Sequence, residues 1–156
     1  MTIIVYRDGV MAADSGGFIG DICVSKSEIK IRRTNNGDLV GASGASGDTE
    51  KFFNWVNDGY VGEPGIKNSF GAIVASRDGK IVRYGHDNGE WYSQDQTYLG
   101  WAAAGAHAEF VLALIFLGVS AKDIVAHACE HCAWAAGSVQ TMELALDAKP
   151  DVERAR

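Results

Sequence analysis

The side chains best suited to catalysis lie near the N-terminus of this 156-residue chain. Removal of Met1 would leave Thr2 as the first residue, with a hydroxyl nucleophile beside an α-amine that is a base near neutral pH. Such a nucleophile needs a cation to hold the charge of its alkoxide, a carboxylate to orient that cation, and amide donors for the oxyanion. We expect Lys30, Asp14 and the turn that contains Gly44 to supply these three groups.

These residue types are not specific by themselves, because a lysine on an edge strand is usually a solvated charge. A second cluster, of His127, Cys129, His131 and Cys132, has the ligand types that zinc prefers. On a helix the histidines share one face and the cysteines lie roughly opposite, so we expect solvated histidines and buried cysteines. The glycine-rich run 41–48 lacks the lysine of a phosphate-binding loop. We therefore predict no cofactor and no metal.

The elements that must position these residues begin with hairpins. Asp-Gly and Asn-Gly turns predict that three pairs of strands are joined by short turns, at 2–6 with 10–13, 28–33 with 39–42, and 70–76 with 80–84. A further strand is expected at 96–99 and a closing strand at 138–144.

Helical spacing of apolar residues predicts three helices. The first runs from a cap at Asp48 to Asn57, and the second covers 110–117 with Phe110, Leu114 and Leu117 on its packed face. The third begins after a Ser120–Asp123 capping box and runs to about residue 135. Hairpins followed by packed helices favour a layered α+β domain over a parallel βαβ sheet.

Composition limits the class of protein. With 47% hydrophobic and 22% charged residues, the chain suits one soluble domain, which we place at 1–146 with a charged tail at 147–156. A net charge of −6 disfavours nucleic acid and membrane surfaces as partners. The longest apolar stretch, 108–119, is interrupted by Glu109 and is too short to span a bilayer. The three cysteines indicate a reducing, cytoplasmic setting.

Four segments in order resemble the proteasome β-subunit family: Thr2, then GVMAADS at 9–15, EIKIRR at 28–33 and SGASGDTEKFF at 43–53. The chain is most similar to the bacterial ATP-dependent protease subunits of the HslV type and to the short relatives that tailed phages encode. The resemblance covers residues 2 to about 144. It implies the N-terminal-nucleophile hydrolase fold, a four-layer αββα sandwich of two antiparallel sheets between helix layers, and subunits that self-associate into rings.

The resemblance also implies roles for single residues. Thr2 matches the nucleophile, Asp14 the aspartate of the family's AAD or AGD motif, Lys30 the lysine of the next strand, and Gly44 the oxyanion-hole amide. The first hairpin is shorter here, but loss of two residues from each strand keeps the register, because side-chain facing repeats every second residue. Thr2 is then expected opposite Ser15, next to Asp14.

Two departures from the family concern the proton path. The family's serine in a GSG-type turn is matched here by the turn at 99–102, so Trp101 is expected where a hydroxyl should stand near Thr2. The family's aspartate near the end of the last helix is matched by Trp134.

The sequence therefore leaves three functions open. In the first, the chain is a threonine peptidase subunit that acts on peptide or protein substrates and is fed by an unfoldase ATPase. In the second, the fold is retained without activity, as a ring-forming structural component such as a phage particle protein, located in the host cytoplasm or the virion. In the third, the chain is an amidase for a small molecule, for which a narrow closed pocket is expected.

Overall fold

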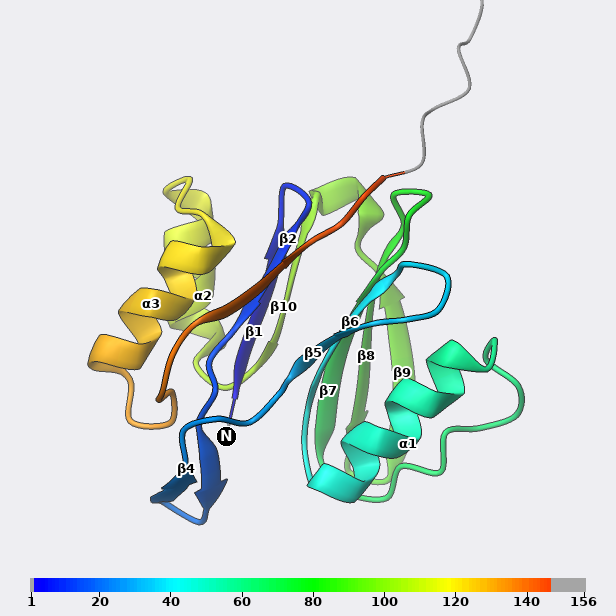
Figure 1. Ribbon diagram of the computed structural model, residues 1–156, viewed down its shortest axis with the longest axis horizontal. Helices are drawn as coiled ribbons and strands as arrows, with labels where there is room; N and C mark the ends of the chain where they lie inside the picture. Colours follow the sequence, from blue (N-terminus) through cyan, green and yellow to red (C-terminus); the bar gives the residue numbers. More distant parts are fainter. Residues whose placement is uncertain (1, 147–156) are drawn as a thin grey trace, which may run out of the picture.

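The computed structural model describes residues 2–146; Met1 and the tail predicted at 147–156 lie outside the described residues. Figure 1 shows four layers in the order helix pair, sheet, sheet, helix. Helices α2 and α3 form the first layer, two antiparallel sheets form the middle, and α1 covers the far side. The predicted αββα arrangement is confirmed.

The first sheet has the strand order β10-β1-β2-β11. Its strands are β1 Ile3–Arg7, β2 Val10–Ala13, β10 Trp101–Gly105 and β11 Gln140–Glu143. Alternate side chains of β1 face opposite layers, because successive residues of a strand point to opposite sides. Ile3 and Val5 pack with the helices, while Ile4 and Tyr6 pack between the two sheets.

The second sheet has the order β5-β6-β7-β8-β9, and a separate two-stranded hairpin, β3-β4, extends beyond the sandwich near the N-terminus in Figure 1. The strands of the second sheet are β5 Ile31–Arg33, β6 Leu39–Ser43, β7 Phe70–Ala75, β8 Ile81–Asp87 and β9 Glu90–Asp95. The hairpin consists of β3 Gly17–Ile19 and β4 Ile22–Ser25. The three hairpins expected from turn sequences all form. Strands β3, β4, β9 and β10 were not predicted.

The strand predicted at 96–99 was wrong, since Thr97–Leu99 forms a 3₁₀ turn. The Asp95 carboxylate accepts a hydrogen bond from the Thr97 backbone N–H at 2.9 Å, which turns the chain locally. The Thr97 hydroxyl in turn accepts the N–H of Ile81 at 3.0 Å. Backbone pairing therefore ends at Gln96, whose N–H donates to the Ile81 carbonyl at 2.8 Å, and the two side-chain bonds take its place.

Helix α1 spans Ser46–Asn57 and buries Phe52 and Val56 against the second sheet. The predicted cap at Asp48 was wrong, because the helix begins two residues earlier without a side-chain cap. Asp48 is instead buried in the first turn, where it accepts a hydrogen bond from the Asn68 amide at 2.9 Å. Its charge also suits the positive end of the helix dipole.

Helix α2 spans Ala108–Phe116 and helix α3 spans Ala121–His131. Val111 and Ile115 form the buried face of α2, so Leu117, predicted to be packed, is 78% exposed. The Ser120 hydroxyl caps α3 as predicted, accepting the Asp123 N–H at 3.1 Å. The helix ends at His131 rather than near residue 135, because the backbone becomes extended at Cys132.

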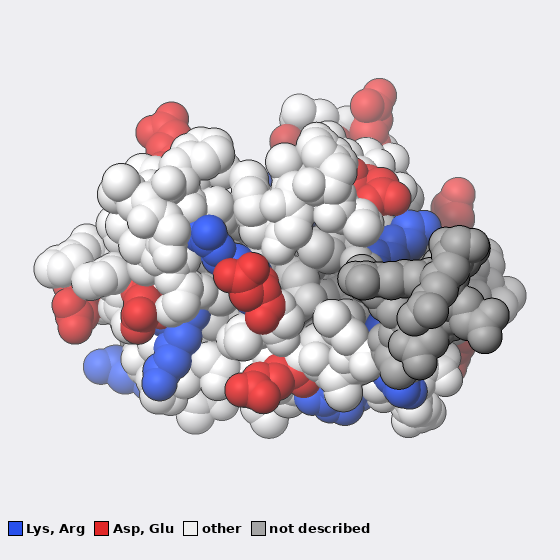
Figure 2. All heavy atoms as spheres, turned by 90° about the horizontal axis from the view of Figure 1, so that it is seen from above, with Lys and Arg blue, Asp and Glu red and all other residues white. Residues whose placement is uncertain are grey.

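Over the described residues, none of the helices is long and apolar enough to cross a membrane. On the face seen in Figure 2, Lys and Arg side chains are interspersed with Asp and Glu and do not gather into a basic patch.

Candidate active site

Thr2 lies at the start of β1, with only 8% of the residue exposed. Its backbone carbonyl accepts the N–H of Ala106 at 2.8 Å, which continues the pairing between β1 and β10. Counting along the strand, Thr2 has the same facing as Ile4 and Tyr6, toward the second sheet. The register of β1 with β2, in which Ile4 pairs with Ala13, places Thr2 opposite Ser15 as predicted.

Thr2 lines a cleft of about 970 Å³ where the two sheets meet the β3-β4 hairpin. Lys30 and Gly44 line the same cleft, so the structure brings these predicted residues together. The remaining walls come from the β3-β4 hairpin, the start of α1 and the β8-β9 strands, and include Phe18, Val24, Ser46, Arg83, His86 and Tyr92. Such a cleft is large enough for several residues of an extended peptide.

Asp14 follows β2 directly and is fully buried. One carboxylate oxygen accepts the Ile3 N–H at 3.0 Å and the Lys30 ammonium at 2.9 Å. The other oxygen accepts the backbone N–H groups of Gly16 at 3.1 Å and Ala136 at 3.2 Å. Four donors thus satisfy the buried charge, and they fix the carboxylate next to the residue that follows Thr2.

The Lys30 side chain is only 8% exposed, and Asp14 is its ion-pair partner. Burial is the largest influence on the Lys30 ammonium and lowers its pKa below the usual value, while the charge of Asp14 acts in the opposite direction. The backbone carbonyl of Lys30 accepts the N–H of Ala42 at 3.2 Å, which ties Lys30 to β6, the strand that ends just before Gly44. A buried cation in a cleft wall suits the stabilisation of a nearby negative charge.

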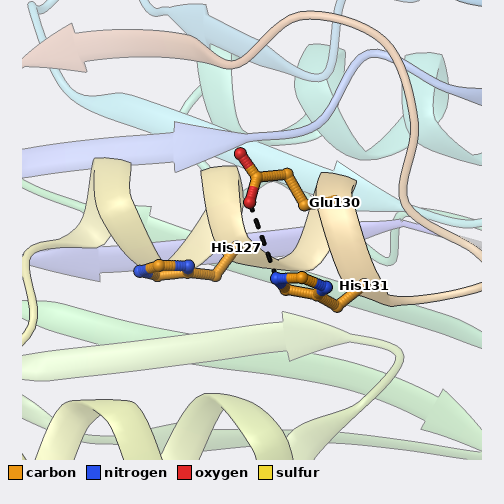
Figure 3. A group of neighbouring side chains, drawn as sticks. All are labelled: His127, Glu130 and His131. Atoms are coloured by element: carbon orange, nitrogen blue, oxygen red, sulfur yellow. Dashed lines mark ion pairs between the residues drawn. The ribbon is translucent and has the colours of Figure 1, made fainter.

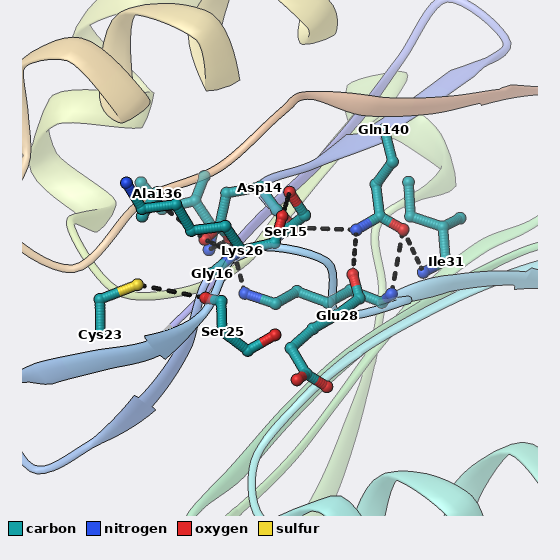
Figure 4. Close-up of polar contacts among 12 residues, drawn as sticks. Asp14, Ser15, Gly16, Cys23, Ser25, Lys26, Glu28, Ile31, Ala136 and Gln140 are labelled. Carbon is teal, nitrogen blue, oxygen red and sulfur yellow. Dashed lines mark hydrogen bonds and ion pairs between the residues drawn. The ribbon is translucent and has the colours of Figure 1, made fainter.

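Gln140 on β11 holds the two halves of this ion pair in place (Figure 4). Its amide oxygen accepts the backbone N–H groups of Lys30 at 3.0 Å and Ile31 at 3.3 Å. Its amide nitrogen donates to the backbone carbonyls of Asp14 at 2.9 Å and Glu28 at 2.8 Å. One side chain therefore links β2 and β5, which belong to different sheets. The sequence analysis missed Gln140, since a glutamine in a short strand carries no sequence signal for such a role.

Gly44 lies between β6 and α1, at the edge of the cleft. A Cβ atom at this position would lie 2.8 Å from the Phe70 ring, so close packing requires glycine. Helix α1 begins at Ser46, and Ala45 and Ser46 line the same cleft, which places the positive end of the helix dipole beside it. The position suits an amide that donates to an oxyanion.

The expectation that Trp101 stands beside Thr2 was wrong. Trp101 pairs with Arg7 at the opposite end of β1, roughly 16 Å along the strand from Thr2. Its indole packs edge-on against Phe116 of α2. The register of β1 with β10, which a local sequence match does not reveal, decides which turn reaches Thr2.

The turn that reaches Thr2 is formed by Gly105, Ala106 and His107, and none of these side chains carries a hydroxyl. His107 has a left-handed backbone, with φ at 61°. Its ring stacks on Trp134, with centroids 5.4 Å apart, and its buried Nε2 atom has no hydrogen-bond partner among the described residues. The Trp134 indole donates to Asp21 at 3.1 Å, so Trp134 ties the loop after α3 to the β3-β4 hairpin.

No protein-family model matches the chain, and no curated protein matches it. Among solved structures, HslV from Trypanosoma brucei superposes with a TM-score of 0.65 and 16% identity over 91% of this chain and 98% of that chain. BPH from Thiobacillus denitrificans gives 0.60 and 17%, over 94% and 99%. The same protein in complex with epoxomicin gives 0.60 and 16%, over 92% and 98%.

TM-scores of 0.60–0.65 establish a shared fold, whereas identities of 16–17% are too low to carry over the chemistry. The chain therefore has the α+β fold of HslV- and proteasome-type β-subunits, in which two antiparallel sheets are packed between helices.

Proposed function

We propose that this protein is a threonine peptidase subunit that hydrolyses peptide bonds with Thr2 after removal of Met1. The observation that carries the proposal is the buried ion pair of Lys30 and Asp14 beside the cleft that Thr2 and Lys30 line. Burying two charges costs free energy that apolar residues would not cost, so an ion pair in this position suits function better than stability.

In the proposed reaction the Thr2 hydroxyl oxygen forms a bond to the substrate carbonyl carbon. Its proton passes to the Thr2 α-amine through a water molecule. Lys30 stabilises the alkoxide, Asp14 holds Lys30, and the backbone amide of Gly44 donates to the oxyanion. The intermediate then releases the leaving amine, which takes the proton, and a water molecule hydrolyses the remaining ester. No step needs a metal or a cofactor.

The size of the cleft supports a peptide substrate. An amidase for a small molecule was expected to have a narrow closed pocket, whereas this cleft measures about 970 Å³ and has walls from both sheets and the β3-β4 hairpin. We take residues 1–146 as one catalytic domain in the cytoplasm, and an unfoldase ATPase as the partner that delivers protein substrates.

Self-association into a ring is the second part of the proposal. Phe116 and Leu117, at the end of α2, are each 78% exposed. Adjacent large apolar side chains are unfavourable in water, which favours their burial against another subunit. Figure 1 places this end of α2 at the turn into α3, at the end of the helix layer away from the N-terminus.

The alternative is a ring-forming structural protein without activity, for instance in a phage particle. One observation favours it: the turn beside Thr2 offers a methyl group at Ala106 and no hydroxyl to relay a proton. Under this alternative the Lys30–Asp14 pair only braces the ends of β2 and β5.

Mass spectrometry of the untagged protein separates the two functions. The proposal expects a mass without the initiator methionine and then a covalent epoxomicin adduct that maps to Thr2. Thr2→Ala is expected to remove both the adduct and peptide hydrolysis while the protein stays folded by circular dichroism. Retention of Met1 throughout, or hydrolysis that survives in Thr2→Ala, would overturn the proposal. A folded oligomer with Met1 retained would favour the structural alternative.

A further inference from the structure

The exposed face of α3 carries His127, Glu130 and His131, a group that the proposed reaction does not use (Figure 3). The two imidazole rings are one helical turn apart and nearly parallel, with centroids 6.5 Å apart and planes inclined by 15°. The Glu130 carboxylate lies 3.5 Å from the Nε2 atom of His131. One ligand atom from each residue lies within 4.8 Å of the other two.

Imidazole nitrogen and carboxylate oxygen are ligands that zinc takes at about 2.0–2.2 Å, which places neighbouring ligands about 3.3 Å apart in a tetrahedron. The three side chains are exposed, so their torsions can close the remaining distance without moving the backbone. The helix fixes their spacing in advance, because residues three and four apart lie on one face. The chain also carries a net charge of −6, which favours cations near its surface.

The cysteines on the same helix do not belong to this group. Cys129 and Cys132 are half-buried and pack against the apolar cluster beneath α2 and α3, as the helical spacing predicted. The four-residue cluster seen in the sequence is therefore divided between two faces of the helix.

We propose that His127, Glu130 and His131 form a surface site for Zn²⁺. Three protein ligands leave a fourth position open to water or to a donor from another molecule. A metal bound to both histidines holds the last turn of α3 together. This turn leads into the segment 132–136, in which the backbone N–H of Ala136 donates to the Asp14 carboxylate. Binding to the folded chain alone raises the free energy of unfolding, so zinc is expected to raise the melting temperature.

Calorimetric titration of the metal-free full chain with Zn²⁺ tests the site. We expect one Zn²⁺ per chain, and a fall in affinity of about tenfold or more in His127→Gln and in His131→Gln. Glu130→Gln is expected to weaken binding, whereas Glu63→Gln, which removes the same charge from an exposed residue in the loop after α1, leaves affinity unchanged. All four positions are exposed, so the variants are expected to fold, and circular dichroism checks this.

A Cys129→Ser/Cys132→Ser variant is the second control and is expected to bind zinc as the parent chain does. X-ray absorption of the zinc-loaded protein should show only nitrogen and oxygen ligands near 2.0–2.2 Å, without the sulfur shell at about 2.3 Å. Binding that persists in the His127→Gln/His131→Gln double variant, binding lost with the cysteines, or a sulfur shell would each overturn the proposal. None of these readouts depends on peptidase activity.

Discussion

The Lys30 ammonium lies 2.9 Å from a carboxylate oxygen of Asp14, in an ion pair whose side chains are 8% and 0% exposed. Asp14 comes from the first sheet and Lys30 from the start of the second, so the pair joins the two sheets beside Thr2. The remaining oxygen capacity of Asp14 is filled by backbone N–H groups. Removing either partner leaves the other as a buried charge without its counterion.

Replacement of Lys30 by methionine tests the value of this pair. We expect Lys30→Met to abolish peptide hydrolysis and to lower the free energy of unfolding by about 3–5 kcal/mol, because a buried carboxylate loses its cation. Urea denaturation measures the change. Lys51→Met is the matched control: Lys51 is 53% exposed and 3.8 Å from Asp48, so its loss is expected to cost about 1 kcal/mol or less. An equal decrease in the free energy of unfolding in the two variants would mean that burial of the Lys30–Asp14 pair does not set its contribution to stability.

The lowered pKa of Lys30 predicts a pH dependence of stability. Between its folded pKa and the usual value of 10.5, the unfolded chain binds more protons at this lysine than the folded chain does. The free energy of unfolding should therefore rise with pH across that window in the parent chain relative to Lys30→Met. The comparison of the two proteins cancels the contributions of other groups. If the difference in the free energy of unfolding between the two proteins stays constant as pH increases toward 10.5, the pKa of Lys30 is not lowered in the folded chain.

Gln140→Leu tests the link between β2 and β5. The side chain makes four hydrogen bonds to backbone groups, so we expect a loss of about 2–4 kcal/mol in the free energy of unfolding. Activity should fall as well, because Asp14 and Lys30 lose their common support. Thr141→Val, at the exposed neighbour on the same strand, serves as the control and is expected to change stability by about 0.5 kcal/mol or less. If Gln140→Leu and Thr141→Val change the free energy of unfolding equally, Gln140 does not link β2 and β5 as described.

Gly105→Ala tests the fit of the turn beside Thr2. A Cβ atom at Gly105 would lie 1.8 Å from the Thr2 carbonyl oxygen, so the start of β1 must move. Gly100 is the control, because it has a similar left-handed backbone but open space around the Cβ position. Gly100→Ala therefore measures the cost of the backbone conformation alone. We expect Gly105→Ala to be about 1–3 kcal/mol less stable than Gly100→Ala by thermal denaturation, with reduced activity. Similar stability would mean that Thr2 does not need this close approach.

A Phe116→Ser/Leu117→Ser variant tests the proposed subunit contact. Both side chains are 78% exposed, and Phe116 makes an edge-on contact with the Trp101 ring, so their replacement should change the stability of the isolated subunit by about 1 kcal/mol or less per site. Sedimentation velocity is expected to show dissociation of the assembly. Val61→Ser, at a residue also 78% exposed but in the loop after α1, should leave the assembly intact. An unchanged assembly in the α2 variant would exclude this end of the helix as the contact.

The sequence by itself determined the elements whose signals are local. Asp-Gly and Asn-Gly turns between apolar runs predicted the three hairpins, and helical spacing predicted α1. The Ser120 hydroxyl caps α3 where expected. Two-residue periodicity also predicted the register that places Thr2 opposite Ser15. Thr2, Asp14, Lys30 and Gly44 were named from residue type and family resemblance; Thr2, Lys30 and Gly44 line one cleft, and the buried Asp14 contacts Lys30.

Only the tertiary structure decided what surrounds those residues. Asp14 meets Ala136 and Gln140 across more than a hundred residues of chain, and no local pattern encodes such contacts. The same reason explains the error at Trp101, since pairing of β10 with β1 brings Ala106 to Thr2 and carries the indole to the far end. Local propensities fix turns and helices, whereas the packing of two sheets fixes which side chains share a site.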